Sequence, residues 1–206
     1  MPQQYFANFP FRGYTLDPNA GVGDYVAVTD IFKRVKFRNE LLGNARLYYP
    51  YQIVEGETPE SIAYKYYGSV DFYWIILLVN SIIDPLRMWP KSYAAFQKHI
   101  VAAYGSLVTA QTSIHHYEKI ITKTNSNGET SQNITWIDKS QYDLITNVVP
   151  QVYSFGDGST VTITTERLQI DCYTYEEQQN DGRRNILLLK SEYLSAVVAE
   201  LESLVS

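Results

Sequence analysis

The sequence predicts an α+β protein, and three observations support that prediction. Apolar residues follow helical spacing in much of the first half and at the C-terminal end, whereas polar and apolar residues alternate from Ile114 onward. Two glycine-containing motifs, Asn127-Gly128 and Gly156-Asp157-Gly158, lie between segments rich in β-branched residues, which is typical of β-hairpins. The chain of 206 residues is long enough for one large domain or two small ones.

The composition argues against several classes of protein. The 22 acidic and 17 basic residues give a formal charge of -5, and no long basic run would follow a phosphate backbone, so we expect no nucleic acid partner. The longest apolar run, residues 72–79, is far shorter than the roughly 18 residues that cross a bilayer, and no export signal is visible, so we expect no membrane partner. The single cysteine, Cys172, cannot form an internal disulfide. The 18 tyrosines suit protein interfaces as well as cores.

Residues 1–49 are expected to form an N-terminal arm followed by a helix. Up to about residue 24, prolines and glycines are scattered among aromatic residues without a helical or strand period, which indicates an extended arm. Thr29 or Asp30 is then placed to cap a helix that ends near Gly43. The aromatic residues of the arm are candidate protein-interface residues: Phe6, Phe9 and Phe11.

Residues 50–90 predict a strand followed by two short helices. "YYPYQIV" favours a strand and "EGET" a turn, after which Thr58 is placed as an N-cap and Gly68 as a helix end. The second helix would start at Ser69 and stop near Asn80. Its apolar run is also consistent with a buried strand, but the polar residues at both ends favour a helix.

The second of these helices is apolar on all sides, so it must be covered on more than one face. The expected core residues of the segment are Ile62, Trp74, Ile75 and Val79. Four aromatic residues around it are candidate interface residues, expected to contact other protein chains or other parts of this chain: Tyr66, Tyr67, Tyr73 and Trp89.

The remaining sequence predicts a connecting helix over residues 91–112, starting near Ser92, and a C-terminal region over residues 113–206. That region contains the two hairpins, a polar segment, a short strand at Ile186–Leu189 and an amphipathic terminal helix capped by Ser191.

The sequence offers no catalytic, metal or cofactor site, and no small-molecule substrate is expected. Glu55 and Glu57, on either side of Gly56, are a carboxylate pair of the kind that glycoside hydrolysis needs, but two carboxylates in an exposed turn usually serve solvation and capping. The adjacent His115 and His116 would point to opposite faces of a strand and would not bind one metal. Cys172 and His99 match no ligand or nucleophile spacing, and glycine-rich phosphate loops are absent.

Part of the chain resembles the LysM module, a βααβ fold best known for binding peptidoglycan and chitin. The phrases "YQIVEGETPESIA", "YYG", a following "W" and "N...DP" carry the resemblance over about 40 residues. The second strand of the module is not found where it is expected, because "LRMWPKSYAAF" stands there. The resemblance implies a glycan-binding accessory protein as one alternative.

A second resemblance covers nearly the whole chain. "TDIF" at 29–32, the LysM-like block, "DP" and the closing "YTYEEQQNDGRRNILLLKSEYLSAVVAEL" resemble the baseplate wedge protein of T4-like contractile-tailed bacteriophages. The resemblance implies a non-enzymatic structural subunit of the virion tail baseplate, assembled in the host cytoplasm. Its partners would be other wedge and hub proteins in a symmetric assembly, without a cofactor. A module this small is at the limit of independent folding, so we expect its apolar surface to bind protein rather than glycan.

Overall fold

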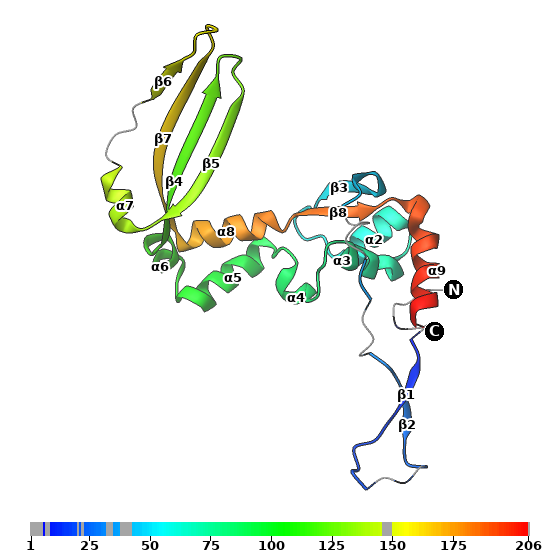
Figure 1. Cartoon of the computed structure of the whole chain (residues 1–206). Helices are drawn as coiled ribbons and strands as arrows, with labels where there is room; N and C mark the ends of the chain where they lie inside the picture. The colour runs from blue at the N-terminus through cyan, green and yellow to red at the C-terminus, as the bar shows by residue number, and fades with distance from the viewer. Residues whose placement is uncertain are drawn as a thin grey trace. The chain divides into compact units, whose positions relative to one another are not determined.

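The computed structural model describes residues 6, 9–19, 21, 23–31, 35–37, 43–145 and 150–205. The chain is divided into two compact units, of which one combines Met1–Ser92 with Asp181–Ser206 and the other is Tyr93–Asn180. The described residues contain both helices and antiparallel sheets, which confirms the α+β class (Figure 1). No helix in these residues is long and apolar enough to cross a membrane.

The first unit is built on a two-stranded antiparallel sheet with two helical segments beside it (Figure 1). The predicted strand, the two helices and the late strand are all present: β3 (Tyr48–Gln52), α2 (Pro59–Tyr67), η2 (Val70–Phe72) with α3 (Tyr73–Val79), and β8 (Asn185–Leu189). β3 pairs with β8 from Tyr48↔Leu189 to Gln52↔Asn185. The shorter and terminal elements of the unit are η1 (Ala45–Leu47), α4 (Pro85–Met88), η3 (Ser191–Tyr193) and α9 (Leu194–Val205).

The boundaries of α2 follow from its sequence. Thr58 accepts a hydrogen bond from the Ser61 backbone N–H, and the Ser61 side chain accepts one from the Thr58 N–H, which makes a reciprocal capping box. Pro59 occupies the first turn, where its missing N–H costs nothing. Gly68 ends the helix with φ of 79°, a left-handed conformation that glycine adopts without strain. The predicted cap and end of α2 are therefore confirmed.

The predicted second helix is confirmed, and the alternative of a buried strand is wrong. Ser69 caps η2 by accepting a hydrogen bond from the Asp71 N–H, and α3 ends at Val79 with Asn80 as its C-cap residue. Two apolar clusters cover α3. One contains Trp74, Ile75 and Val79 with residues of β3, β8 and α9, and the other contains Ile76 with residues of α2 and β8. Burial on both sides explains why the helix is apolar all round.

The N-terminal residues form a two-stranded antiparallel ladder. β1 (Phe11–Tyr14) pairs with β2 (Val26–Thr29), from Phe11↔Thr29 to Tyr14↔Val26. The helix predicted from Thr29 or Asp30 to Gly43 is wrong where the structure can be compared, because Thr29 ends β2 and residues 35–37 have no regular structure. The rest of that segment lies outside the described residues. The helical spacing of Ile31 and Val35 therefore did not predict the conformation of the described residues of this segment.

The second unit is a four-stranded antiparallel sheet with helices, in the strand order β5-β4-β7-β6. Both predicted hairpins are confirmed, and Gly128 and Gly158 have the positive φ that their turns require. The elements are α5 (Tyr93–Tyr104), α6 (Leu107–Thr112), β4 (Ile114–Asn125), β5 (Thr130–Ile137), α7 (Lys139–Leu144), β6 (Gln151–Ser154), β7 (Thr160–Asp171) and α8 (Cys172–Gly182).

Two details of the C-terminal region differ from the sequence prediction. The polar segment before the late strand is the helix α8, whose first turn is held by Asp171, since its carboxylate accepts bonds from the Thr174 N–H and hydroxyl. The terminal helix is present, but Ser191 does not cap it. Ser191 begins η3, whose N-cap residue is Lys190 and makes no side-chain capping bond.

Candidate protein-interaction site

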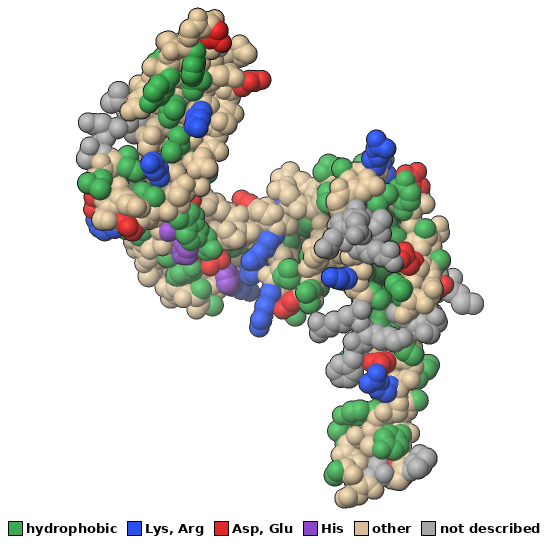
Figure 2. All heavy atoms as spheres, viewed as in Figure 1, with side chains coloured by type: hydrophobic (Ala, Val, Ile, Leu, Met, Phe, Trp, Pro, Cys, Tyr) green, Lys and Arg blue, Asp and Glu red, His purple; other side chains and the backbone are tan. Residues whose placement is uncertain are grey.

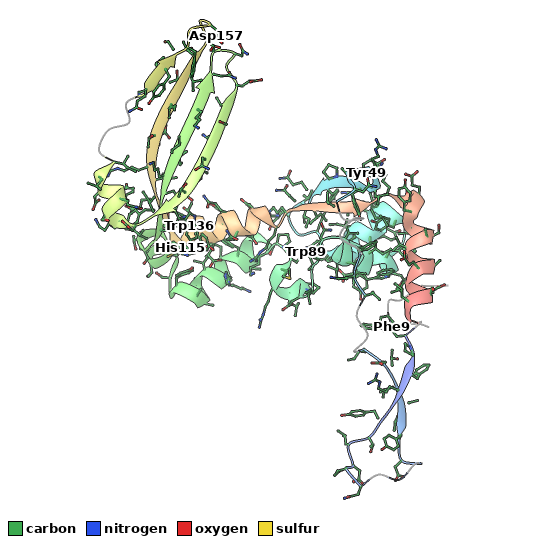
Figure 3. The ribbon with its side chains drawn as sticks, viewed as in Figure 1. Phe9, Tyr49, Trp89, His115, Trp136 and Asp157 are labelled. Carbon is green, nitrogen blue, oxygen red and sulfur yellow. The ribbon has the colours of Figure 1, made fainter. Side chains whose placement is uncertain are left out.

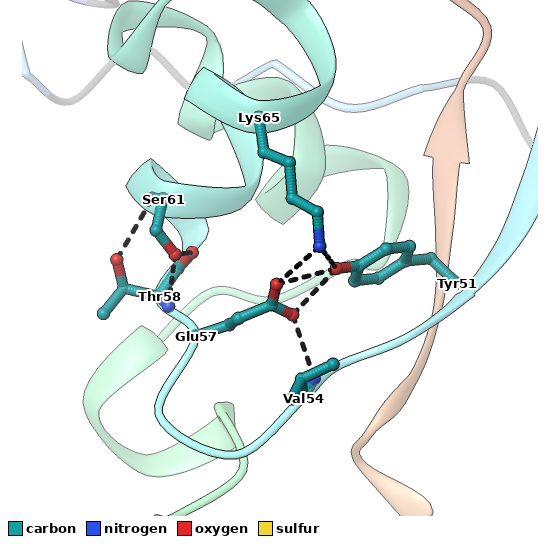
Figure 4. A network of polar contacts seen from close by, with 6 residues as sticks. All are labelled: Tyr51, Val54, Glu57, Thr58, Ser61 and Lys65. Carbon is teal, nitrogen blue, oxygen red and sulfur yellow. Dashed lines mark hydrogen bonds and ion pairs between the residues drawn. The ribbon is translucent and has the colours of Figure 1, made fainter.

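The turn after β3 is organised around the carboxylate of Glu57 (Figure 4). The Tyr51 hydroxyl lies 2.8 Å from both carboxylate oxygens and donates to them. The Val54 backbone N–H donates at 2.9 Å, and Lys65 Nζ donates from α2 at 3.0 Å. The network therefore connects the end of β3, the turn and the second half of α2.

Glu57 stays ionised in this network. Burial raises the pKa of its carboxyl, but the hydrogen bonds from Val54, Tyr51 and Lys65 outweigh burial and hold the pKa below its ordinary value. Glu55 faces a different partner, because Arg184 Nη2 lies 2.9 Å from its carboxylate. The two carboxylates thus have separate structural partners, and Glu57 is not suited to donate a proton to a leaving group.

Residues from later in the chain also form hydrogen bonds with this turn. The Trp89 indole N–H donates to the Glu57 carbonyl at 2.8 Å, and Ile53 N–H donates to the Arg184 carbonyl at 2.8 Å. Arg184 also donates to the Lys91 carbonyl at 3.4 Å. These contacts place Trp89 and Arg184 against the turn between β3 and α2.

Asn80 connects the end of α3 to the outer side of β8. Its side-chain amide donates to the Leu187 carbonyl and to the Ile76 carbonyl, each at 2.8 Å. Its side-chain oxygen accepts from the Leu187 N–H at 2.8 Å. One amide side chain thus satisfies both backbone groups of a strand residue that lies 107 positions later.

The four predicted interface residues around this block are half-buried within the unit. Tyr66 and Tyr67 belong to a chain of edge-to-face ring contacts that runs from Tyr49 to Phe72. The Tyr67 hydroxyl donates to the Leu189 carbonyl at 3.0 Å, and burial raises the pKa of this hydroxyl. Tyr73 and Trp89 pack against the cluster that contains Ile76. A large part of each of these rings therefore contacts this chain itself.

The expected core residues are buried. Trp74 is 4% exposed, Val79 is equally buried, and Ile62 and Ile75 are inaccessible. Phe9 of the arm, labelled in Figure 3, is 2% exposed, and it belongs to the same apolar cluster as Trp74. This burial leaves Phe6 and Phe11 as the exposed members of the arm set.

Exposed apolar side chains gather on the β1–β2 ladder, where Figure 2 shows several of them on one face. Phe11 is 74% exposed, and Leu16 and Val26 are also open to solvent. Arg12 pairs with the buried carboxylate of Asp30 at 2.9 Å, next to the end of the ladder where Phe11 faces Thr29. Exposed apolar groups at this density are typical of surfaces that bind protein.

Comparisons with known proteins identify the family of this chain. A family model described as Base plate wedge protein 53 matches residues 3–204, nearly the entire chain. The chain belongs to the base plate wedge protein 53 family. Baseplate wedge protein gp53 of Enterobacteria phage T4 is 30% identical over 141 residues, which span 67% of this chain and 65% of the T4 protein.

The histidines of this family member differ from the sequence expectation. A register shift between Ile114 and His116 interrupts the alternation of β4, so the two side chains do not point to opposite faces. Their Nδ1 atoms lie 2.9 Å apart, His115 stacks on Tyr175 and His116 stacks on Trp136. The prediction of opposite faces is therefore wrong, because a strand bulge is not visible in the sequence.

The structure does not bring the other candidate chemical groups into a reactive cluster. Cys172 lies in the apolar cluster of α5 and α6, and burial raises the pKa of its thiol. His99 Nε2 lies 3.4 Å from the Glu176 carboxylate. Within the described ranges, no three His, Cys, Asp or Glu side chains are grouped so that they could hold a metal ion.

Sequence reasoning missed the residues that connect distant segments of this base plate wedge family member. Asn80 was expected only to end a helix, and Arg184 only to lie in a polar segment. A helix-ending Asn and an Arg before an apolar strand were visible in the sequence, but their partners depend on the pairing of β3 with β8.

Proposed function

We propose that the protein is a non-enzymatic structural subunit of a phage tail baseplate wedge, which contacts other wedge and hub proteins in a symmetric assembly. The family match over residues 3–204 carries this proposal. The exposed apolar side chains of the β1–β2 ladder support it, because such side chains need a partner surface. Phe6 and Phe11 are the arm residues that we propose to lie in the interface. The subunit would reside in the virion tail and be assembled in the host cytoplasm.

We further propose that residues 50–90 form a LysM-like module whose second strand comes from β8. The order strand, helix, helix and antiparallel strand in β3, α2, α3 and β8 supports this proposal. The second strand would thus lie far from its expected place in the sequence, and residues 93–180 would be an insertion between the second helix and that strand.

This module is proposed to contact protein rather than glycan. Sugar binding of the LysM type uses the first turn together with the second-strand side of the module. Here the indole of Trp89 bonds to the Glu57 carbonyl of that turn, and Arg184 bonds to Glu55. Tyr66, Tyr67 and Tyr73 are half-buried in the unit, so they offer little open ring surface for stacking on a sugar.

The proposed role is tested by deleting the gene in its phage and examining the tails by electron microscopy. We expect particles without complete baseplates, and restored baseplates when the protein is supplied from a plasmid. Mass spectrometry of purified wild-type baseplates should detect the chain. Normal baseplates in the deletion mutant would contradict the proposal.

The glycan alternative has its own test. Chitin oligomers and peptidoglycan fragments are titrated into the purified protein while tyrosine and tryptophan fluorescence is recorded. We expect no saturable change at micromolar concentrations. Saturable binding that is lost on substitution of the Gly56 turn would favour a cell-wall role instead.

A further inference from the structure

The strands at the edges of the sheets differ in how well their free backbone groups are protected. Pro50 lies in the middle of β3, where it has no N–H to offer. On β8 the side chain of Asn80 binds both the N–H and the C=O of Leu187. β6 is only four residues long. Proline, a covering side chain and short length are devices that prevent strand addition at an edge.

β5 has none of these protections along the described part of the chain. It lies at the end of the sheet order β5-β4-β7-β6 and is eight residues long. Its sequence, "TSQNITWI", contains no proline and no charged residue. An edge strand of this length and composition is a template for another strand.

The turn before β5 determines which backbone groups point outward. Asn125 N–H donates to the Glu129 carbonyl at 3.0 Å, so this pair is a hydrogen-bonded one. Hydrogen-bonded and non-hydrogen-bonded pairs alternate along an antiparallel ladder, and Thr124↔Thr130 is the next pair. The backbone groups directed away from β4 therefore belong to Thr130, Gln132, Ile134 and Trp136.

The same residues carry the exposed apolar side chains of the strand. Ile134 is 55% exposed and Trp136 is 58% exposed. Trp136 stacks on His116 with ring centroids 4.0 Å apart, so its indole is held in place although it is exposed; Figure 3 shows Trp136 beside His115 at one end of the sheet, opposite Asp157. A strand added at this edge would place its own side chains next to these two residues.

The charges at the ends of β5 indicate what kind of strand would fit. Glu129 precedes the strand and Asp138 follows it, and both are exposed. Antiparallel pairing of β5 with the β5 of a second copy would bring these acidic residues toward each other, which is unfavourable. A strand with basic residues near its ends would be complementary.

We propose that the outer edge of β5 receives an extended strand of another protein, with apolar residues at alternate positions and Lys or Arg near its ends. Main-chain hydrogen bonds to Thr130, Gln132, Ile134 and Trp136 supply the affinity, and Ile134 and Trp136 select the side chains. The inference rests on the proposed baseplate role, because the partner is a component of that assembly.

Amide hydrogen exchange tests the proposal, because outward and inward amides alternate along β5 and a bound strand would protect only the outward ones. In the isolated protein, the outward amides of Gln132 and Ile134 should exchange quickly, while the inward amides of Asn133 and Thr135 are protected. In purified baseplates, the outward amides should become protected as well. If the chain is present in baseplates but its outward amides exchange as in the isolated protein, this inference is overturned and the proposed function stands. If the chain is absent from baseplates, the proposed function fails.

A matched pair of variants gives an independent test. Gln132→Pro removes one outward N–H, whereas Gln132→Ala keeps it, and both lose the side-chain bond to Thr122. We expect Gln132→Pro to enter baseplates about tenfold less well than wild type, and Gln132→Ala to enter them normally. Equal incorporation of both variants would overturn the proposal. Circular dichroism of the isolated variants checks that they fold. If Gln132→Pro does not fold, the hydrogen-exchange experiment alone tests whether a strand binds at β5.

Discussion

Replacing Glu57 with glutamine tests how much the turn network contributes to the stability of the first unit. The carboxylate accepts hydrogen bonds from Tyr51, Val54 and Lys65, and losing a bond to a charged acceptor costs about 1.5–3 kcal/mol. Lys65 is 62% exposed, so solvent screens its ion pair with Glu57 and weakens it. Glutamine keeps one oxygen for the Val54 N–H. We therefore expect Glu57→Gln to lower the free energy of unfolding by about 1–2 kcal/mol at pH 7.

The effect should depend on pH in a defined direction. The folded state holds the pKa of Glu57 below its ordinary value of 4.5, so the unfolded chain binds the proton more tightly. The stabilisation is therefore complete above the unfolded pKa and is lost as the pH falls through the folded one. Accordingly, the difference between wild type and Glu57→Gln should shrink below pH 4.5.

The measurement is urea unfolding followed by tryptophan fluorescence at pH 7 and in acid. Glu60→Gln is the matched control, because it removes the same charge from the exposed first turn of α2. It should cost no more than a few tenths of a kcal/mol, as expected for a charge near a helix N-terminus. Equal losses for the two variants at pH 7, or a loss for Glu57→Gln that persists in acid, would refute the reasoning.

Three further predictions concern the core, the β8 contact and the arm. Trp74→Ala should lower the free energy of unfolding by about 3–5 kcal/mol, the range for emptying a buried aromatic site. Trp136→Ala, at an exposed position of β5, should lower it by less than about 1 kcal/mol, and urea unfolding of both variants measures the difference. Asn80→Asp should lower the free energy of unfolding by about 2–3 kcal/mol at pH 7, because a carboxylate oxygen would replace the amide nitrogen that donates to the Ile76 and Leu187 carbonyl groups. An unchanged unfolding midpoint would contradict this prediction. Brief proteolysis should cut the isolated protein near Leu16, which is exposed beyond the end of β1, but should leave this site intact in assembled baseplates, and equal cleavage in both states would count against a partner that covers the β1–β2 ladder.

Sequence reasoning succeeded where the signal was local. Thr58, Pro59 and Gly68 predicted the limits of α2 because a cap, a first-turn proline and a left-handed end depend on neighbouring residues only. The Asn127-Gly128 and Gly156–Gly158 turns predicted the hairpins for the same reason. Burial of Trp74 followed from a helix that is apolar on all sides.

The sequence predictions failed where a helix has no apolar stripe and where the structure depends on contacts between distant segments. The helix α8 is polar, and its packing against α5 depends on tyrosines, as in the ring contact of Tyr173 with Phe96, so no apolar stripe was visible. The β1–β2 ladder is set by pairing between segments, which apolar spacing does not encode. The partners of Asn80 and Arg184 became defined only once β3 paired with β8.

The pairing of β3 with β8 also determines how the first unit can form. Leu188 and Leu189 of β8, together with Val198 and Leu201 of α9, complete the apolar clusters that cover α2 and α3. These residues follow the whole of the second unit in the chain, so the clusters remain open until the last part of the sequence has been made. The second unit has its own sheet and its own apolar cluster, and its contacts are closer in sequence. Because closing a long loop costs entropy before any contact compensates for it, the second unit should order first and bring β8 toward β3. The inserted unit would then serve two purposes. It would reduce the loop-closure entropy that β8 loses on pairing with β3, and it would present the outer edge of β5 to a partner.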